Sequence, residues 1–257
     1  MRVFLIIDET NFYHPEFAAE LINNKEYEYV GAALVTKSIL MDYMQKNWHF
    51  LKFSELARLS LKQIELKAKD KLLSKKKRQA FYSVSSVLDY YGIDYFEVER
   101  DIHTEEYLNF IRSKAPDVII SSNSLILRKK LLSIPKICSI NRHSSLLPAY
   151  GGIWPVFHAY RKGEEFVGVT IHTMESKVDE GIILAQRKIK IEPHDVVDSL
   201  YKKCFDVSAE ACFEALEKIR SGKYKESHIP PVHTPSYYSF PTKADWMEFR
   251  AKNGKFI

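Results

Sequence analysis

The sequence lacks the features that mark a disulfide-rich, membrane-spanning or strongly basic protein. Only three of its 257 residues are cysteines, and no CxxC or HExxH spacing occurs, so we expect neither a disulfide framework nor a metal site. No stretch approaches the ~20 consecutive apolar residues of a membrane helix. The net charge of +5 is well below the load of a dedicated nucleic-acid binder. These absences favour a reduced, cytoplasmic protein without metal or membrane contact, and they argue against a nucleic-acid partner.

The N-terminus also lacks the long apolar region of a secretory signal. Its apolar run covers five residues, from Val3 to Ile7, and ends at Asp8 and Glu9. A signal peptide has a longer apolar region followed by a cleavage site of small residues. We therefore interpret Val3–Ile7 as a first buried strand.

What the sequence does have is an alternation of short apolar runs with longer helical patterns. This order is typical of a mostly parallel sheet covered by helices, so we predict an α/β protein with a Rossmann-like core. The last two predicted strands flank a polar loop and could pair as a hairpin. The predicted strands are Val3–Ile7, Tyr29–Val35, Ile93–Val98, Val118–Ser121, Lys136–Asn141, Val167–Thr173 and Ile182–Ile191.

Helical patterns define the remaining organisation. A helical insertion is expected at about residues 36–90, and a long helix at 195–220, whose buried stripe includes Cys204. Prolines and aromatics follow, and a last short helix is expected at Lys243–Ala251. We therefore expect a catalytic core of residues 1–192 and a C-terminal helix and extended tail, 193–257, packed on that core.

A lysine-rich tract lies within the insertion. Between Lys62 and Arg78, eight basic residues face two acidic ones, Glu65 and Asp70. The favoured interpretation is a solvated helix face or a helix–helix junction. The alternative is a contact surface for an anionic partner such as phosphate or nucleic acid. Few aromatic residues are interleaved, which weakens the case for base stacking.

The most informative stretch runs from residue 139 to residue 186. Asn141 and His143 stand two apart at the end of a predicted strand, so their side chains should share one face. Open α/β sheets bind ligands beyond the carboxyl ends of their strands, where this pair would lie. A second polar loop carries Asp179, and Gly181 permits a sharp turn there. Loops that deliver Asn, His and Asp suit acyl or formyl transfer.

Each of these residue types has a role in such chemistry. Transfer to an amine needs a base near neutral pH, which His143 can supply. It needs a neutral donor for the oxyanion of the tetrahedral intermediate, which Asn141 can supply. A carboxylate such as Asp179 can orient the imidazole and balance its charge. Taken alone, a single strand-end histidine is more often satisfied by local hydrogen bonds than catalytic.

Three motifs in this stretch resemble the folate-dependent formyltransferase family. The first fits the pattern N-x-H-x-S-L-L-P-x-[YF]-x-G, the second is G-V-T-x-H, and the third is a D-x-G loop. They occur here as Asn141-Arg-His-Ser-Ser-Leu-Leu-Pro-Ala-Tyr-Gly-Gly152, Gly168-Val-Thr-Ile-His172 and Asp179-Glu-Gly181. The close match covers residues 117–192. The order and spacing of the three motifs make this resemblance specific.

The resemblance implies an N-formyltransferase that uses 10-formyltetrahydrofolate as formyl donor. By motif, Asn141 is the oxyanion donor, His143 the proton-transfer residue and Asp179 its carboxylate partner. The pterin of the donor would lie against the loop of the aspartate and against the strand end before the Asn141 strand. The apolar residues expected to wall it are Leu125, Leu127, Met174 and Val178.

Departures from the family pattern bear on the acceptor. The family often has proline where Ser144 stands and a basic residue where Gly151 stands. The first strand–helix turn, residues 6–17, contains no glycine, which argues against glycinamide ribonucleotide, because members that formylate it use a glycine-rich turn there. About 35 residues follow the long helix, which argues against methionyl-tRNA, because those members carry a further barrel domain. A small amine, such as an amino sugar nucleotide, is the acceptor left.

Alternatives stay open at this point. Water as acceptor would make the protein a formyltetrahydrofolate hydrolase. Two further hypotheses are a methionyl-tRNA formyltransferase-like protein and a non-catalytic interaction module that uses residues 62–78. Tyr150, Trp154 and the segment Tyr237–Phe240 are candidate platforms for a sugar or base, although core packing is the favoured interpretation for them. A homodimer is compatible with the sequence.

Overall fold

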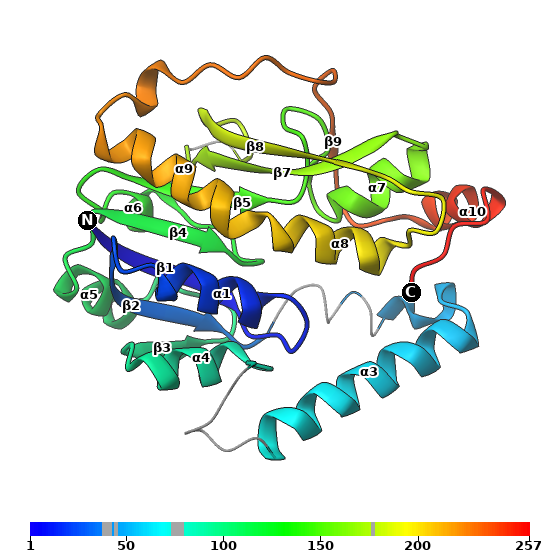
Figure 1. Cartoon of the computed structure of the whole chain (residues 1–257), viewed down its shortest axis with the longest axis horizontal. Coiled ribbons are helices and arrows are strands. Elements are labelled where there is room, and N and C mark those ends of the chain that lie inside the picture. Colours follow the sequence, from blue (N-terminus) through cyan, green and yellow to red (C-terminus); the bar gives the residue numbers. More distant parts are fainter. Residues whose placement is uncertain (38–42, 44–45, 73–79, 176–177) are drawn as a thin grey trace. The chain divides into compact units, whose positions relative to one another are not determined.

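The computed structural model describes all residues except 38–42, 44–45, 73–79 and 176–177. A mostly parallel seven-stranded sheet has the strand order β3-β2-β1-β4-β5-β7-β8, which confirms the predicted α/β class (Figure 1). Its strands are β1 (Arg2–Asp8), β2 (Glu28–Val35), β3 (Tyr95–Val98), β4 (Val118–Ser122), β5 (Cys138–His143), β7 (Phe166–Thr173) and β8 (Ile183–Lys190). Contacts divide the chain into two compact units, described separately below.

The first unit comprises residues 1–46 and 59–140. Strand β1 pairs in parallel with β2 and β4, and β2 pairs in parallel with β3. Because β1 is central, six of its seven residues are buried, which explains its unbroken apolar run. The unit's helices are α1 (His14–Asn23), α4 (Val84–Tyr91), α5 (Glu105–Ser113) and α6 (Lys129–Leu132). The Ser83 side chain caps α4, and Gly92, at φ 66°, ends it.

The predicted helical insertion is confirmed for the residues that are described. It contains the 3-10 turn η1 (Trp48–Phe50), the 20-residue helix α3 (Phe53–Leu72) and α4. Within the basic tract, Lys62 lies 5.2 Å from the centroid of the Phe12 ring, and Lys69 pairs with Glu65. Lys67 and Lys71 are exposed, and the basic residues 75–78 lie outside the described residues.

The second unit comprises residues 47–58 and 141–257. Strands β7 and β8 pair antiparallel, which confirms the predicted hairpin. Helices α8 and α9 pack along this hairpin (Figure 1). Its other elements are β6 (Gly151–Gly152), α7 (Pro155–Lys162), α8 (Val197–Asp206), α9 (Ser208–Arg220), η2 (Tyr224–Glu226), β9 (Tyr237–Tyr238) and α10 (Lys243–Ala251).

The prediction of one helix over 195–220 is wrong, because the chain forms two helices that meet at Val207. The backbone of Val207 has φ −101° and ψ 0°. The Ser208 hydroxyl donates to the Cys204 carbonyl at 2.6 Å, the acceptor that a continuous helix offers to the Ser208 N–H. Arg142 Nε of β5 donates to the same hydroxyl at 2.8 Å. A contact from a distant strand therefore accompanies the break. Cys204 is a buried core residue, as expected, and so is Cys212.

The C-terminal helix α10 has the predicted bounds and packs on α7. Thr242 and Asp245 form a capping box at its start. Trp246 and Phe249 are buried, and their rings lie 4.7 and 4.9 Å from that of Phe157. The tail therefore adds a hydrophobic layer to the second unit.

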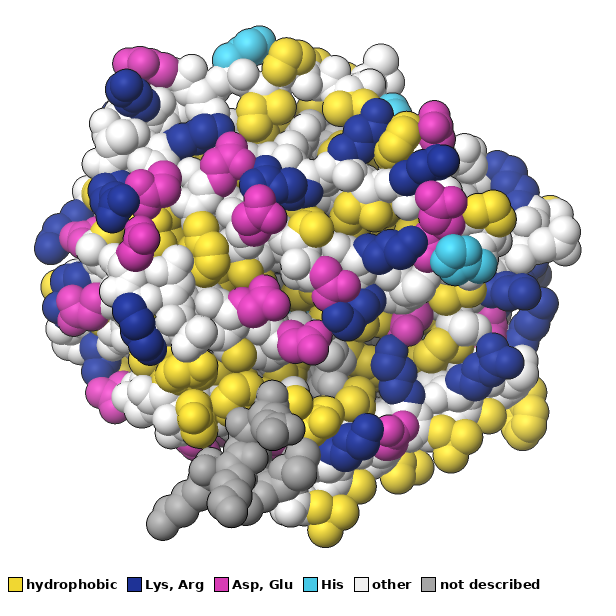
Figure 2. Space-filling view, viewed as in Figure 1, with side chains coloured by type: hydrophobic (Ala, Val, Ile, Leu, Met, Phe, Trp, Pro, Cys, Tyr) yellow, Lys and Arg dark blue, Asp and Glu magenta, His cyan; other side chains and the backbone are white. Residues whose placement is uncertain are grey.

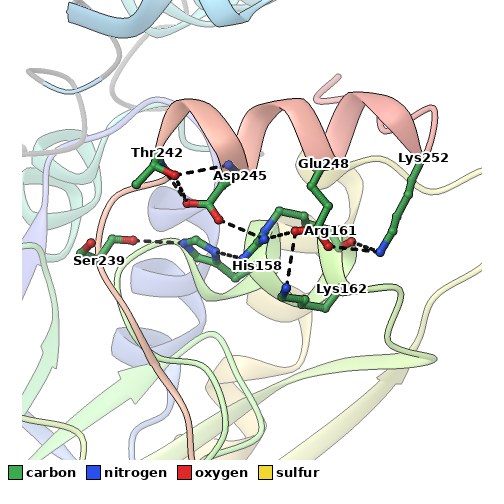
Figure 3. A network of polar contacts seen from close by, with 8 residues as sticks. All are labelled: His158, Arg161, Lys162, Ser239, Thr242, Asp245, Glu248 and Lys252. Atoms are coloured by element: carbon green, nitrogen blue, oxygen red, sulfur yellow. Dashed lines mark hydrogen bonds and ion pairs between the residues drawn. The ribbon is translucent and has the colours of Figure 1, made fainter.

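A buried arginine joins α7 to α10 through a polar network (Figure 3). Arg161 forms ion pairs with Asp245, at 3.0 Å, and with Glu248. Its Nη2 donates to His158 Nδ1 at 3.2 Å, and His158 Nε2 donates to the Ser239 carbonyl at 3.1 Å. This pattern requires a neutral imidazole, and burial lowers the pKa of His158 to about 4.

The free energy of unfolding should fall in acid because His158 takes up a proton when the chain unfolds. Its pKa is about 4 in the folded chain, against 6.5 as the ordinary value, so unfolding takes up a proton between these values. The stabilisation is complete above pH 6.5 and is lost as the pH falls towards 4, by on the order of 2 kcal/mol. His158→Gln keeps a donor and an acceptor without titrating. Urea unfolding at several pH values should therefore show a smaller acid loss in the variant, and equal losses would contradict this account.

Candidate active site

Strand β5 presents its last residues alternately to its two faces. The Arg142 guanidinium lies over the Phe205 ring at 3.6 Å, on the side covered by α8. Asn141 and His143 contact β7 and the Asp179 loop instead. The period of two in the strand therefore places both predicted residues on one side, with the arginine on the other.

The loop after β5 is held by hydrogen bonds that orient His143. The Thr170 hydroxyl of β7 donates to the Ser145 carbonyl at 2.7 Å and accepts from the Leu147 N–H at 3.1 Å. The loop then returns to the strand end, and His143 Nε2 lies 3.0 Å from the Tyr150 carbonyl. A carbonyl can only accept, so Nε2 carries the proton. In the neutral imidazole, Nδ1 then holds the free lone pair.

The second loop holds Asp179 in a left-handed backbone conformation at φ 58°. A side chain at Gly181 would place its Cβ 1.6 Å from the Thr173 carbonyl oxygen, so glycine is required for the close turn. The Asp179 carboxylate accepts from the Gly152 N–H at 2.7 Å through Oδ2. This bond joins the Asp179 loop to the loop that carries Tyr150.

These loops bring the three predicted residues together around a fourth, His172 of β7. Asp179 Oδ1 lies 3.8 Å from His143 Nδ1 and 3.6 Å from His172 Nε2. Asn141 Nδ2 lies 3.3 Å from the same His172 nitrogen. His172 was not among the residues predicted for the site, although it is the last residue of the G-V-T-x-H motif. Its position in that motif was the signal that could have identified it.

Burial sets the charge state of His172. Its side chain is 2% exposed, and desolvation lowers its pKa to about 4, while the Asp179 carboxylate acts in the opposite direction. Nδ1 lies 2.8 Å from the Thr173 carbonyl and therefore carries the proton. Nε2 is left as an acceptor for the Asn141 amide. His172 thus acts as a neutral residue that orients Asn141.

The arrangement has the elements of acyl-group transfer. An imidazole with a free lone pair, His143, lies beside a carboxylate that can balance the charge of its protonated form. An amide donor, Asn141, lies in the same cluster and has a second N–H beyond the one directed at His172. Burial excludes water, which strengthens each electrostatic interaction in the cluster.

The residues predicted to wall the donor lie on two segments. Leu125 and Leu127 follow β4 in the first unit, where Leu127 is buried and Leu125 is half-buried. Met174 and Val178 belong to the second unit and flank residues 176–177, which lie outside the description. Val178 is 50% exposed. The Asp179 loop therefore presents an apolar side chain to solvent directly beside its carboxylate.

The candidate aromatic platforms have different surroundings. Trp154 is buried against Phe157 and Trp246, which confirms its interpretation as a core residue. Tyr150 stacks on Tyr238, with ring centroids 5.5 Å apart. Tyr237 is exposed, and its ring lies beside Gly151 and Gly152 in the β6–β9 pair. Tyr237 is therefore the aromatic side chain of this segment that is open to a ligand near Asp179.

Tyr150 also lines a cavity of 460 Å³. Its lining includes Lys162, Glu164, His233 and Tyr238.

Among the described residues, no group of three or more His, Cys, Asp and Glu side chains could hold a metal ion. In the same part of the chain, no helix has the length and apolar character needed to cross a membrane.

Comparison with known proteins identifies the family. The family model described as formyl transferase matches residues 64–216, more than half of the chain. The chain belongs to the formyl transferase family. The matched range contains Asn141, His143, His172 and Asp179.

Curated relatives in this family include methionyl-tRNA formyltransferases. That of Thermotoga maritima is 37% identical over 170 residues, which cover 65% of this chain and 54% of the relative. The formyl transferase chain described here thus spans about half the length of the curated relatives that it matches.

Solved structures of the family share the fold. Phosphoribosylglycinamide formyltransferase from Anaplasma phagocytophilum has a TM-score of 0.61 at 17% identity, covering 94% of this chain and 99% of that one. WlaRD, a sugar 3N-formyl transferase solved in the presence of dTDP and 5-N-formyl-THF, has a TM-score of 0.58 at 14% identity, covering 93% and 70%. At these identities the likeness establishes the fold alone.

The protonation state of His172 can be tested by nitrogen NMR of the imidazole side chains. We expect His172 to stay neutral, with its proton on Nδ1, down to a pH near its pKa of about 4. Asp179→Asn should lower this pKa further, because the carboxylate charge raises it. The spectrum of His172→Gln assigns the signal. An imidazolium signal for His172 at pH 6, or a rise of its pKa in Asp179→Asn, would contradict the assignment.

Proposed function

We propose that the protein is an N-formyltransferase that moves a formyl group from 10-formyltetrahydrofolate to a primary amine. The observation that carries this proposal is the cluster of Asn141, His143, His172 and Asp179 in a chain of the formyl transferase family. A binding module has no need of a base, an amide donor and a carboxylate in one buried cluster. Formyl transfer uses all three.

His143 acts as the base in this proposal. Its Nε2–H is held by the Tyr150 carbonyl, so the Nδ1 lone pair is available to take a proton from the attacking amine. The resulting imidazolium carries its new proton towards Asp179 Oδ1, which lies 3.8 Å from Nδ1. The carboxylate therefore stabilises the charged form of the base until the imidazolium returns the proton to N10 of the donor. The bond between N10 and the formyl carbon then breaks, and tetrahydrofolate leaves.

Asn141 stabilises the oxyanion. One of its amide hydrogens is directed at His172 Nε2, and the other is free to donate to the formyl oxygen. This role depends on a neutral His172, since a protonated Nε2 would repel the amide N–H. The lowered pKa of His172 preserves the arrangement at neutral pH.

The formyl donor supplies an activated formyl group bound to nitrogen, and the chain offers an apolar surface for its ring system. The exposed Val178 adjoins Asp179 in the sequence, and we assign it and the half-buried Met174 to the donor. Leu125 and Leu127, in the first unit, stay predictions from the family pattern. The sugar 3N-formyl transferase WlaRD, which has this fold, was solved with 5-N-formyl-THF.

For the acceptor we favour a small amine such as an amino sugar nucleotide. Two carboxyl groups stand at the end of β1, where a phosphate-binding turn would carry glycines: Asp8 is the last residue of the strand and Glu9 follows it. Asp8 accepts hydrogen bonds from Ser124, and Glu9 accepts from the Val84 and Ser85 N–H groups. Carboxyl groups at this turn, in place of glycine N–H groups, argue against the phosphate of glycinamide ribonucleotide. The exposed ring of Tyr237, near Asp179, offers a stacking surface for a sugar.

Loss of the base should abolish transfer. His143→Ala should lower the rate of tetrahydrofolate formation, measured with 10-formyltetrahydrofolate and a panel of amines, by ~10²–10⁴-fold. His194→Ala is the control, because it removes an exposed histidine outside the cluster, and it should retain the wild-type rate. Equal rates for His143→Ala and wild type would contradict the proposal, as would a folded wild type that forms no tetrahydrofolate with any amine.

The donor site can be tested separately by calorimetry. Val178→Arg should weaken binding of a stable 10-formyltetrahydrofolate analogue by at least ~10-fold, because it places a charge against the ring. Val232→Arg changes another exposed valine in the same unit and should bind like wild type. Equal binding by both variants would remove Val178 from the donor site.

A second candidate acceptor is methionyl-tRNA, favoured by the 37% identity to the Thermotoga maritima methionyl-tRNA formyltransferase. Including methionyl-tRNA in the acceptor panel separates the two candidates. Formate release without any amine would instead indicate a hydrolase, with water as the acceptor at the same site.

A further inference from the structure

An apolar stripe runs along the solvent-exposed side of helix α3. Phe53 is 87% exposed, Leu61 66%, Ile64 64% and Leu72 83%. The smaller Ala57 and Ala68 complete the stripe. Figure 2 shows a row of apolar side chains along the lower right edge, where Figure 1 places α3. Exposure of so many large apolar groups on one helix is uncommon in a monomer and marks an interaction surface.

The six positions lie on one side of the helix. At 100° per residue, positions 53, 57, 61, 64, 68 and 72 fall within an arc of about 100°, the width of a helix face that packs against a partner. Other faces of α3 contact the chain. Glu55 pairs with Arg250, and Lys62 lies over the Phe12 ring. The stripe is therefore a face separate from those used for internal packing.

The order of side chains in this stripe is symmetric about its centre. Leu61 and Ile64 are equally far from the midpoint between residues 62 and 63. Ala57 and Ala68 are equally far from it, and so are Phe53 and Leu72. An antiparallel pair of identical helices related by a two-fold axis at this midpoint would bring large side chains against large ones at the centre and ends. The alanines would meet in between, where they let the helices approach.

We propose that α3 is the interface of a homodimer, in which two copies pair antiparallel through this stripe. A two-fold axis makes the surface self-complementary, so that each residue meets its counterpart twice. Charge supports the same register. Arg58 and Glu65 flank the stripe along one margin, at positions that oppose each other across an antiparallel pair. Within one chain, Glu65 pairs with Lys69, and Arg58 reaches the Ile257 carbonyl at 3.5 Å.

The size of the stripe fits this occupant. Its four large side chains expose on the order of 600 Å² together, most of the ~800 Å² that each partner of a standard interface buries. Lys67 and Lys71 also flank the stripe. An apolar stripe with basic margins can bind an anionic lipid surface, but the symmetry of the stripe and the Arg58–Glu65 register favour a second copy.

The oligomeric state of the full chain tests the proposal. Sedimentation equilibrium should give twice the chain mass of 30.0 kDa for wild type. Ile64→Lys should raise the dimer dissociation constant by on the order of 10²-fold, because it buries a charge at the centre of the interface. Met247→Lys is the matched control, since Met247 on α10 is also 64% exposed, and it should stay dimeric. A monomeric wild type, or a dimer unaffected by Ile64→Lys, would overturn the proposal.

Charge reversal and crosslinking test the register. Arg58→Glu and Glu65→Arg should each weaken the dimer, whereas the double variant should restore it. Phe53→Cys mixed with Leu72→Cys should form a disulfide-linked dimer under mild oxidation, and neither variant alone should do so beyond the wild-type background. Crosslinking of Phe53→Cys alone would indicate a parallel pair. If wild type is monomeric and binds anionic vesicles, and if Ile64→Lys abolishes that binding, the homodimer proposal is overturned and the stripe is instead a lipid-binding surface.

Discussion

The hydrogen bond from the Gly152 N–H to Asp179 Oδ2 is the interaction on which the candidate site depends. It uses one carboxylate oxygen to join two loops that are distant in the sequence. The other oxygen, Oδ1, is then fixed within 4 Å of both imidazoles. Close approach of backbone at Gly152 and Gly181 permits this geometry, since a Cβ at either position would collide with a carbonyl oxygen. Glycine is therefore required at both positions because other side chains would collide with neighbouring backbone, and not only because the chain turns there.

Burial and charge act in opposite directions on the two histidines of the cluster. Desolvation lowers the pKa of His172, the nearby carboxylate raises it, and desolvation has the larger effect. One imidazole is thereby kept neutral as a positioning group. His143 has its Nε2 proton held by a carbonyl and its Nδ1 directed towards Asp179. Two histidines beside one carboxylate can thus serve different purposes, because their hydrogen-bond partners fix different tautomers.

Sequence reasoning succeeded where the pattern is local. The alternation at Asn141 and His143, the β7–β8 hairpin and the last helix, Lys243–Ala251, all follow from short-range rules. It failed at Val207, where the helix breaks beside a contact between Ser208 and Arg142 of a distant strand. It also omitted His172, because periodicity alone cannot distinguish a strand histidine in the core from one that orients a neighbour. Tertiary contacts decide both cases.

The C-terminal tail belongs to the site rather than to the periphery of the second unit. The Ser236 carbonyl accepts from the Gly151 N–H at 2.9 Å, and the Tyr238 carbonyl accepts from the Ile153 N–H at 2.8 Å. These bonds hold the loop whose Tyr150 carbonyl fixes the His143 tautomer and whose Gly152 N–H fixes Asp179. The tail is itself fixed by Arg161 and the α10 aromatics. The orientation of the base therefore depends on residues almost a hundred positions further along the chain, which is why the motif alone does not make the site.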